Sequence, residues 1–356
     1  MKGFVIMAEN KFNYRFSAGS VVYTADGVCL TIKRRCGKFD TPKYWVEQNG
    51  SVYDETELFS ENPNEPTEEE VRKDFYAREL RRLNNENKAL SKYSRNLNLL
   101  ALNGELAMTY DREKEVAEIS TILLRRTKPN PLLIGIAGCG KTAIVEELAR
   151  KFVNEHLTTD NPHTPIIYDL SLNSLVSGAR YRGDFEERLQ AILDIVSENK
   201  DIIIFIDEIH SLNSIGNSEG ATSAGQILKP ALARGEIRCI GATTIDEYKE
   251  YITTDKALTR RFSVVNVSPI TGTTRYNCTT NILAEYGQYF GIDTSKVKAE
   301  TLLNIIDNCI PDTVFPDNVI DIIDETLATA KANEKTEIND DDIKKTVNRQ
   351  HNIIVL

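Results

Sequence analysis

The sequence predicts an α/β protein in which a parallel sheet with a phosphate-binding loop is followed by helices and preceded by a small β domain and a long helix. Three observations support this fold class. A glycine-rich loop at residues 135–142 lies between the apolar run 131–134 and the helix-like segment 142–150. The run at 201–206 has the nearly unbroken apolar character of a strand buried on both faces. From about residue 268 the pattern becomes helical.

Residues 14–59 are predicted to form a small β-barrel-like domain. Two tight-turn dipeptides, Asp26-Gly27 and Asn49-Gly50, punctuate segments that alternate in polarity or are β-branched. These strand-like segments are 19–24, 28–33, 43–47 and 51–53. Short strands with tight turns in so short a stretch resemble Tudor-like domains.

Cations and aromatic rings in this domain have two interpretations. Basic residues are expected to crowd the loop between the second and third strands: Lys33, Arg34, Arg35, Lys38 and Lys43. They would form a recognition surface together with Tyr23, Tyr44, Trp45 and Tyr53. Alternatively, the rings fill a small core and the cations only solvate a loop. The sequence leaves both interpretations open.

Residues 60–97 are predicted to be a polar, proline-containing linker followed by a long helix. Thr67-Glu-Glu-Glu70 is typical of a capping box at a helix start. Apolar residues then recur every seven positions, with Leu80 and Asn87 between them: Tyr76, Leu83, Leu90 and Leu97. This spacing permits a short coiled coil in which Asn87 fixes the register. It equally permits packing of the helix against its own chain.

An α/β core is predicted for residues 98–265, and its phosphate loop has the sequence Gly-Ile-Ala-Gly-Cys-Gly-Lys-Thr. Glycines allow backbone N–H groups to surround phosphates at the positive end of the following helix. Lys141 is expected to reach the β- and γ-phosphates, and Thr142 to bind Mg²⁺. The expected nucleotide-binding residues are Gly135, Ala137, Gly138, Cys139, Gly140, Lys141, Thr142, Ala143 and Asp207.

An acidic pair, Asp207-Glu208, ends the apolar run at 201–206. Acids at the carboxyl end of such a strand lie at the crevice where α/β sheets bind ligands. We expect Asp207 to hold the Mg²⁺ shell together with Thr142, and Glu208 to orient and deprotonate the attacking water. The sequence therefore predicts hydrolysis of ATP with Mg²⁺, rather than binding alone.

A helical lid is predicted for residues 266–350. Its candidate helices are 281–289, 298–308, 317–334 and 340–349.

Composition narrows the class of protein. The 356 residues are 41% hydrophobic and 27% charged, with a formal net charge of −10, which argues against broad coating of nucleic acid. Six cysteines without a C-x-x-C pair are expected to be reduced thiols of a cytoplasmic protein. The apolar amino-terminal start is too short for a signal sequence, and no run approaches membrane length. We expect His210, close to the acidic pair, to pack rather than to bind a ligand.

Beyond the two nucleotide motifs, the sequence resembles the first ATPase module of the Clp family of AAA+ protein unfoldases. The resemblance runs from about Lys92 to the last residue. Matching segments follow the family's order and spacing: 97–106, 112–113, 125–131, 178–189, 229–236, 240–244, 257–262 and 315–325. The fold that this resemblance implies is an AAA+ parallel-sheet core with a helical lid.

The segment 178–189 is similar to the family's substrate-gripping pore loop. This similarity implies that an extended polypeptide contacts the Tyr181 ring, because a flat amphipathic ring gives much contact area for little conformational entropy. The residues of this expected pore loop are Arg180, Tyr181, Arg182 and Gly183.

The resemblance also implies roles for three polar residues in catalysis. Thr243 would polarise the attacking water or sense the γ-phosphate. Arg260 and Arg261 would be supplied to the ATP of a neighbouring subunit, where an arginine stabilises charge on the transferring phosphoryl group.

The sequence departs from the family pattern at several places. Ile136-Ala137 replaces the usual Glu-Pro, which removes no phosphate ligand. Asp111 replaces the glycine before the adenine-side arginine, and Met-Thr-Tyr110 forms the preceding turn, so the base contacts stay open. Asn318 replaces a lysine in the lid. We expect the β domain and long helix to stand in place of the family's amino-terminal domain, and this sequence stops where a second module would begin. No Ile-Gly-Phe/Leu loop is present, so we expect no peptidase partner.

The expected function is that of a ring-forming ATPase, a homo-hexamer, that pulls protein segments through its pore and selects cargo with its β domain. One alternative is an AAA+ motor or loader that acts on nucleic acid through the basic β domain. The aromatic pore loop and the net negative charge disfavour it. A second alternative is a regulatory subunit that mixes into rings of a full-length Clp protein.

Overall fold

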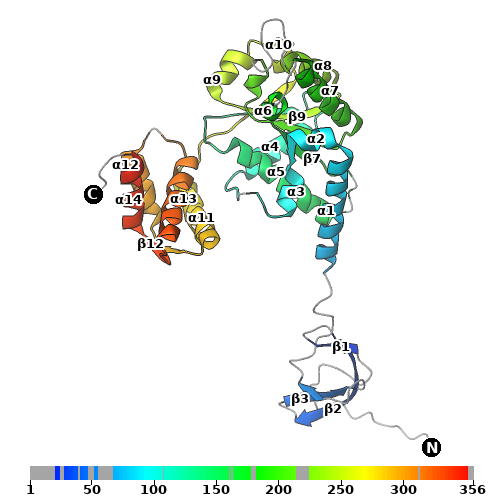
Figure 1. Ribbon diagram of the computed structural model, residues 1–356, viewed down its shortest axis with the longest axis vertical. Helices are drawn as coiled ribbons and strands as arrows, with labels where there is room; N and C mark the ends of the chain where they lie inside the picture. The colour runs from blue at the N-terminus through cyan, green and yellow to red at the C-terminus, as the bar shows by residue number, and fades with distance from the viewer. Residues whose placement is uncertain are drawn as a thin grey trace, which may run out of the picture. The chain divides into compact units, whose positions relative to one another are not determined.

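The computed structural model describes residues 21–24, 28–38, 41–46, 52–54, 67–106, 108–159, 161, 163–177, 182–213, 224–311 and 313–351 (Figure 1). Contacts within the chain divide it into two units, Met1–Phe75 and Tyr76–Leu356. Within the described residues, no helix combines the length and the apolarity that crossing a membrane needs.

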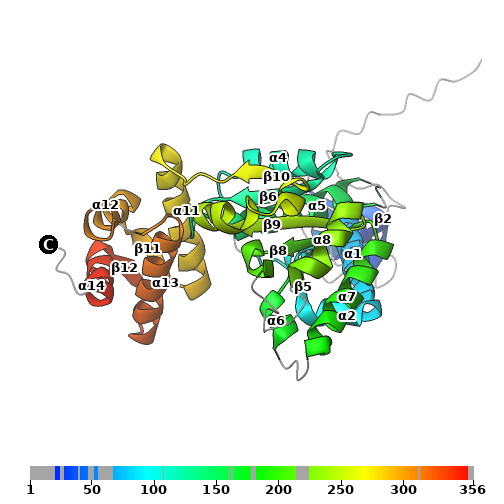
Figure 2. The same ribbon diagram turned by 90° about the horizontal axis from the view of Figure 1, so that it is seen from above.

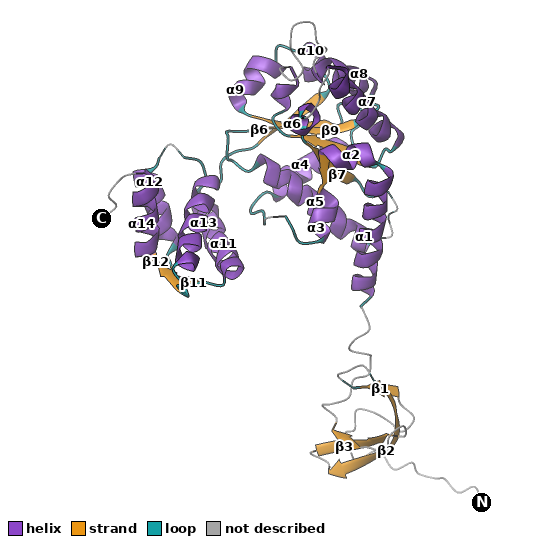
Figure 3. Cartoon of the chain, in the orientation of Figure 1, coloured by secondary structure: helices purple, strands orange, loops and turns teal. Residues whose placement is uncertain are grey.

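The first unit contains a four-stranded antiparallel sheet in the order β1-β2-β3-β4 (Figure 3). The strands are β1 (Val21–Tyr23), β2 (Cys29–Lys38), β3 (Thr41–Val46) and β4 (Val52–Asp54). Among the side chains of this sheet that the structure describes, Val22, Leu30, Ile32 and Val46 are buried. Closure of this sheet into a barrel stays a prediction, and both predicted turn dipeptides lie outside the described residues.

The prediction that basic residues crowd a loop between the second and third strands was wrong. Strand β2 continues to Lys38 and pairs with β3 from Ile32↔Val46 to Lys38↔Thr41, with one irregularity near Arg34. Lys33 and Lys38 therefore lie on a strand, because the antiparallel ladder extends almost to the turn. Basic residues have no strong turn chemistry of their own, so the sequence carried little signal for where this strand ends.

The long helix predicted up to residue 97 is shorter in the structure. Helix α1 (Glu68–Glu86) begins with the expected capping box, in which Thr67 N–H donates to Glu70 Oε2 and Glu70 N–H donates to Thr67 Oγ1. The helix is interrupted at Asn87, whose side chain donates to the Leu83 carbonyl. After the break come α2 (Lys88–Tyr93), strand β5 (Ser94–Asn96) and α3 (Leu97–Leu102).

The apolar residues of the seven-residue repeat pack against other parts of the same chain. Tyr76 and Leu80 are buried against Val153 and Leu157 of the helix that follows the phosphate loop. Leu90 is fully buried in the core of the α/β sheet. Of the two alternatives for this segment, the structure shows packing against the chain itself.

A six-stranded sheet forms the centre of the second unit, and Figure 2 labels its strands β10, β6, β9, β8 and β5. Five strands are parallel, and β5 pairs antiparallel to β7 at one edge. The order is β10 (Phe262–Asn266), β6 (Asn130–Ile134), β9 (Arg238–Thr243), β8 (Ile202–Ile206), β7 (Ile166–Leu170), β5. The sheet thus begins before residue 98, the start predicted for the α/β subdomain.

Helices cover both faces of this sheet, as expected for a parallel sheet. Side chains of β8 alternate between the two cores: Ile203 and Phe205 join one, and Ile202, Ile204 and Ile206 join the other. The first core includes residues of α3, α4 (Glu113–Leu123) and α5 (Lys141–Thr158). The second includes residues of α2, α6 (Leu172–Val176), α7 (Arg182–Glu198) and α8 (Ala224–Arg234).

Short helical turns connect the remaining strands. They are η2 (Ile209–Asn213), α9 (Ile245–Glu247), η3 (Tyr248–Ile252) and α10 (Lys256–Thr259).

The helical region after β10 has its own hydrophobic core, separate from the two cores of the sheet. Its helices are α11 (Gly272–Phe290), α12 (Ala299–Cys309), α13 (Asp317–Ala332) and α14 (Asp340–His351). A short parallel pair joins them, β11 (Asp293–Lys296) with β12 (Glu337–Asn339), drawn as strands in Figure 3.

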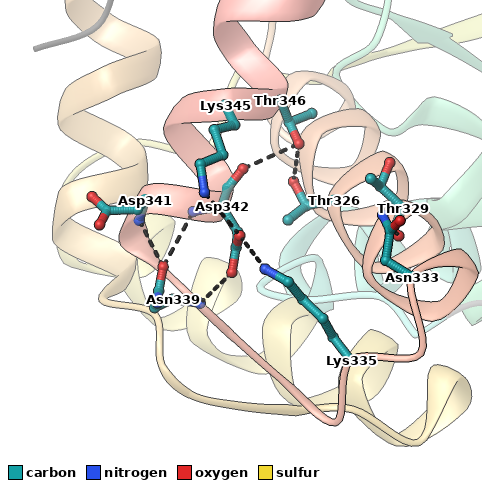
Figure 4. A network of polar contacts seen from close by, with 9 residues as sticks. All are labelled: Thr326, Thr329, Asn333, Lys335, Asn339, Asp341, Asp342, Lys345 and Thr346. Carbon is teal, nitrogen blue, oxygen red and sulfur yellow. Dashed lines mark hydrogen bonds and ion pairs between the residues drawn. The ribbon is translucent and has the colours of Figure 1, made fainter.

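Polar contacts fix the start of α14 in this region (Figure 4). The Asn339 side chain accepts hydrogen bonds from the N–H groups of Asp341 and Asp342, and Asp342 accepts in return from Asn339 N–H. The buried hydroxyls of Thr326 and Thr346 join α13 to α14 at 2.9 Å.

Candidate nucleotide site

The phosphate loop leaves the buried strand β6 and enters α5, as the motif requires. Gly138 and Gly140 have φ angles of 74° and 87°, a left-handed conformation that favours glycine. A side chain at Gly138 would also collide with the lid, because its Cβ would lie 2.8 Å from Asp317 Oδ2. Both glycines therefore permit the backbone conformation of the loop, and Gly138 also permits its close approach to Asp317.

Lys141 and Thr142 begin α5, and their side chains contact the phosphate loop and the acidic pair, respectively. Lys141 Nζ donates to the carbonyls of Gly135 and Ile136, at 3.1 and 3.0 Å. Thr142 Oγ1 donates to Asp207 Oδ2 at 2.7 Å. The structure thus brings the two expected Mg²⁺ ligands together, and a hydroxyl beside a carboxylate is an oxygen donor set that suits this hard cation.

The acidic pair lies directly after the buried strand β8. Glu208 adopts a left-handed conformation, with φ of 49°, and its N–H donates to Asp207 Oδ1 at 2.9 Å. Both residues line the same cleft as the phosphate loop, and the Glu208 side chain is exposed there. The backbone turn separates the two carboxylates, so that one faces Thr142 and the other stays free for water.

Thr243 ends β9, between the strands that carry the phosphate loop and the acidic pair. Its side chain is 1% exposed. The Thr243 hydroxyl donates to Glu247 Oε2 at 3.2 Å and lies 3.3 Å from His210 Nδ1. His210 therefore makes a polar contact with a residue of the site. From the sequence we expected it only to pack.

Arg112 is a site residue to which sequence reasoning gave no role. Its guanidinium is 5% exposed and donates to the Cys139 carbonyl at 2.7 Å, which fixes the middle of the phosphate loop. It also donates to the Ser268 carbonyl and to Glu115, both at 2.9 Å. The only sequence signal was the likeness of Arg112-Glu113 to the family's adenine-side turn.

The phosphate loop, the acidic pair, Thr243 and Arg112 line one cleft of about 950 Å³. Apolar residues also line the cleft, and these include Met108, Ile270, Ile282 and Ile320. The cleft thus combines polar groups suited to phosphates with apolar walls suited to a base.

Residues of the helical region after β10, the predicted lid, add polar groups to this cleft. The Tyr110 hydroxyl donates to Glu285 of α11 at 2.8 Å. Burial raises the pKa of Asp317, helped by Asp321 and opposed by the charge of Lys141. Asp317 therefore places a carboxyl group beside the phosphate loop, a feature that the sequence motifs did not indicate.

Among the other predicted site residues that the structure describes, Gly183, Arg260 and Arg261 do not line the cleft. Arg260 and Arg261 follow α10 and are exposed, and neither guanidinium has a hydrogen bond or ion pair within the part of the chain that the structure describes. Gly183 is exposed in the first turn of α7. Arg180 and Tyr181 lie outside the described residues, as does the side chain of Arg182.

A phosphate loop between strand and helix, an acidic pair on β8 and a hydroxyl on β9 together define a P-loop ATPase site. Residues 131–269 match the ATPase family associated with various cellular activities (AAA). The chaperone protein ClpB of Aquifex aeolicus is 42% identical over 264 residues, which are 74% of this chain and 26% of that protein. The ClpB 1 protein of Thermosynechococcus vestitus is 44% identical over 247 residues, 68% of this chain and 28% of that protein.

Solved structures of Hsp104 are also similar. The S. cerevisiae Hsp104–ADP complex has a TM-score of 0.66 and 33% identity, covering 74% of this chain and 45% of that chain. The chain belongs to the Clp family of AAA+ proteins. It spans little more than a quarter of the length of the ClpB relatives that it matches.

Proposed function

We propose that this chain hydrolyses ATP with Mg²⁺ and uses the energy to unfold or translocate protein substrates as a subunit of a hexameric ring. The observation that carries the proposal is the Thr142–Asp207 contact beside the exposed Glu208 in one cleft. A cryo-EM structure of Hsp104 with ATPγS and FITC casein is 33% identical to this chain, with a TM-score of 0.63. That similarity supports ATP as the nucleotide and protein as the substrate.

Each residue of the site has a distinct task in this proposal. Backbone N–H groups of the phosphate loop bind the phosphates, and Lys141 exchanges its two carbonyl partners for phosphate oxygens. Thr142 and Asp207 would hold Mg²⁺, which when bound neutralises charge on the β- and γ-phosphates. Glu208 accepts a proton from the attacking water.

Arg260 and Arg261 complete the site of the next subunit in this proposal. Their exposure and their position outside the cleft of their own chain support a role in trans. Substrate polypeptide would contact the loop that contains Arg180, Tyr181, Arg182 and Gly183. The region 98–265 would act as the motor, 266–350 as its lid and 60–97 as the connection to the cargo-selecting region 14–59. The free cysteines among the described residues support the cytoplasm as its location.

The decisive experiment compares nucleotide turnover with nucleotide affinity in Glu208→Gln. We expect turnover to fall by about two orders of magnitude or more, the size of a general-base contribution. Affinity for ATP should stay unchanged, because the carboxylate acts on water and not on the nucleotide. Turnover is measured as released phosphate, and affinity as binding of a fluorescent ATP analogue.

Two controls separate this result from general damage. Lys141→Ala should weaken ATP binding itself, since Lys141 contacts the phosphates. Glu118→Gln makes the same change of charge on the exposed face of α4 and should leave turnover unchanged. Equal turnover in Glu208→Gln and the wild type would refute the role of Glu208. Protein captured by the Glu208→Gln variant in ATP, set against captured DNA or RNA, separates the protein substrate from the nucleic-acid alternative.

A further inference from the structure

Three groups that are able to donate a hydrogen bond lie around one carboxylate oxygen next to the nucleotide cleft. Glu247 Oε2 accepts from Thr244 N–H at 2.9 Å and from the Thr243 hydroxyl at 3.2 Å. His210 Nδ1 lies 3.1 Å from the same oxygen. The three donors come from different elements: the end of β9, the start of α9 and the turn η2.

The Glu247 carboxylate acts here as an acceptor only. Burial raises the pKa of Glu247, but the hydrogen bonds from Thr244 and the interactions with His210 and Thr243 outweigh burial and hold the pKa below its usual value. An ionised carboxylate has no hydrogen to donate. The Thr243 O–H therefore points toward Glu247. We assign a hydrogen to His210 Nδ1, because a lone pair on that nitrogen would face the carboxylate at 3.1 Å, and this nitrogen contacts the Thr243 oxygen at 3.3 Å.

This arrangement fixes the polarity of the Thr243 hydroxyl. A threonine hydroxyl has one hydrogen and two lone pairs. With its hydrogen on Glu247, the oxygen can only accept further hydrogen bonds. His210 Nδ1, at 3.3 Å, takes up one lone pair at most, so one acceptor position remains. Thr243 and Glu247 both line the cleft that contains Glu208.

We propose that Glu247 and His210 are positioning residues that make Thr243 a hydrogen-bond acceptor for the attacking water, and not a donor to the γ-phosphate. This inference rests on the proposed ATP hydrolysis. One water hydrogen would bind Thr243 Oγ1, and the other would pass to Glu208 as the water oxygen bonds to the γ-phosphorus. The bond from that phosphorus to the bridging oxygen breaks, and its electron pair stays on ADP. Two acceptors on the water would turn its lone pair toward phosphorus.

The test measures kcat and the affinities for ATPγS and ADP in Glu247→Ala, Thr243→Val and the double variant. Each single variant should lower kcat about tenfold or more, which corresponds to ~1.4 kcal/mol of activation free energy. The ratio of ATPγS to ADP affinity should stay within about twofold of the wild type, since no donor to the γ-phosphate is lost. The double variant should lose no more than the single ones, because both act through one hydroxyl.

Matched variants control for the stability of α9. Glu247 forms a capping box with Thr244, so Thr244→Ala measures the cost of losing that cap while Glu247 still contacts Thr243. Asp246→Ala removes an exposed acid from the same helix and should leave kcat unchanged. Glu247→Gln keeps an acceptor oxygen at the same length, so it should lose less activity than Glu247→Ala.

Two results would overturn the inference while leaving the proposed hydrolysis intact. In the first, Glu247→Ala turns over ATP as fast as Asp246→Ala. In the second, Thr243→Val weakens ATPγS about tenfold more than ADP, which would show that the hydroxyl donates to the γ-phosphate. A wild-type protein without ATPase activity would instead refute the proposed function, and the inference with it.

Discussion

Arg112 illustrates how one buried side chain holds the phosphate loop in place. A guanidinium has five donors in a fixed planar fork, and Arg112 directs them to two backbone carbonyls and one carboxylate. Cys139, whose carbonyl accepts one of these bonds, is itself fully buried, and burial raises the pKa of its thiol. The conformation of the loop therefore depends on a residue that is distant from it in sequence.

We expect Arg112→Ala to weaken ADP binding and to lower the free energy of unfolding. The variant leaves the Cys139 and Ser268 carbonyls without their donor, and a buried group without a partner costs about 1–3 kcal/mol. Calorimetric titration with ADP and thermal unfolding measure the two effects. Arg126→Ala, on an exposed arginine nearby, should change neither. An unchanged ADP affinity in Arg112→Ala would show that the loop keeps its conformation without this residue.

At the scale of elements, the cleft depends on a contact between the segment before α4 and the lid helix α11. Tyr110 is partly buried against the core of the helical region, and its hydroxyl donates to Glu285. Burial, with the carboxylate of Glu285 beside it, raises the pKa of Tyr110 above its ordinary range. The hydroxyl therefore stays protonated at neutral pH and continues to donate.

We expect Tyr110→Phe to speed the release of ADP by about threefold to tenfold. The substitution removes one hydrogen bond to a charged group and keeps the ring that packs on the lid, and such a bond contributes about 1 kcal/mol or more. Stopped-flow displacement of a fluorescent ADP analogue measures the rate. Tyr289→Phe, an exposed tyrosine on the same helix, is the matched control. Identical release rates for both variants would rule out a role for this contact in lid opening.

In the helical region, Asp342 at the start of α14 makes a contribution to the free energy of unfolding that depends on pH. Burial raises the pKa of Asp342, but hydrogen bonds from Lys335 and Asn339 and the charges of Lys335 and Lys345 outweigh burial and lower the pKa. Figure 4 shows these groups converging on Asp342. A folded-state pKa below the unfolded value means that the contribution is complete above the unfolded pKa and is lost as pH falls through the folded pKa.

We expect Asp342→Asn to lower the melting temperature at pH 7, and the difference from wild type to shrink as pH falls below about 4, the ordinary pKa of an aspartate. Calorimetry at several pH values measures it. Asp341→Asn is the control, because the Asp341 backbone N–H contacts Asn339 whichever side chain it has. A difference between wild type and Asp342→Asn that does not change with pH would contradict the ionic origin of this contribution.

At the scale of the whole molecule, an arginine is needed to stabilise the transferring phosphoryl group. Among the described residues of the cleft, the arginines are Arg95 and Arg112. Arg95 forms an ion pair with Asp169, at 2.6 Å, and Arg112 is committed to carbonyls. Exposed Arg260 and Arg261 are therefore the natural candidates to act in an assembled ring.

We expect the ATPase rate per subunit to rise with protein concentration, and the double variant Arg260→Ala/Arg261→Ala to inhibit wild-type protein when the two are mixed. Each variant subunit would leave a neighbouring site without its arginine, an effect worth about 10³–10⁵ in other phosphoryl-transfer proteins. Arg126→Ala, mixed in the same ratio, is the control. Rates that follow only the amount of wild-type protein, with a monomer in light scattering, would exclude action in trans.

Some residues of the site could be predicted from the sequence, and others became evident only in the tertiary structure. The phosphate loop and Asp207-Glu208 are contiguous motifs whose spacing is set by the local chemistry of phosphate and metal binding, so the sequence indicated them directly. Arg112, Tyr110 and Asp317 have no such local pattern, because their partners Cys139, Glu285 and Gly138 lie far along the chain. The extent of β2 and the break at Asn87 were also not predictable, since strand pairing and packing override weak local signals.

The sequence by itself determined the fold class and the phosphate-binding chemistry, because hydrophobic periodicity, glycine placement and short motifs act over a few residues. It also permitted the apolar repeat from Tyr76 to Leu97 to pack in either of two ways. Only the tertiary structure decided that Tyr76 and Leu80 pack on α5, and that Thr243, Glu247 and His210 form one hydrogen-bonded group. The reason is physical: which buried surfaces and which hydrogen-bond partners meet depends on strand order, and strand order is a property of the whole chain.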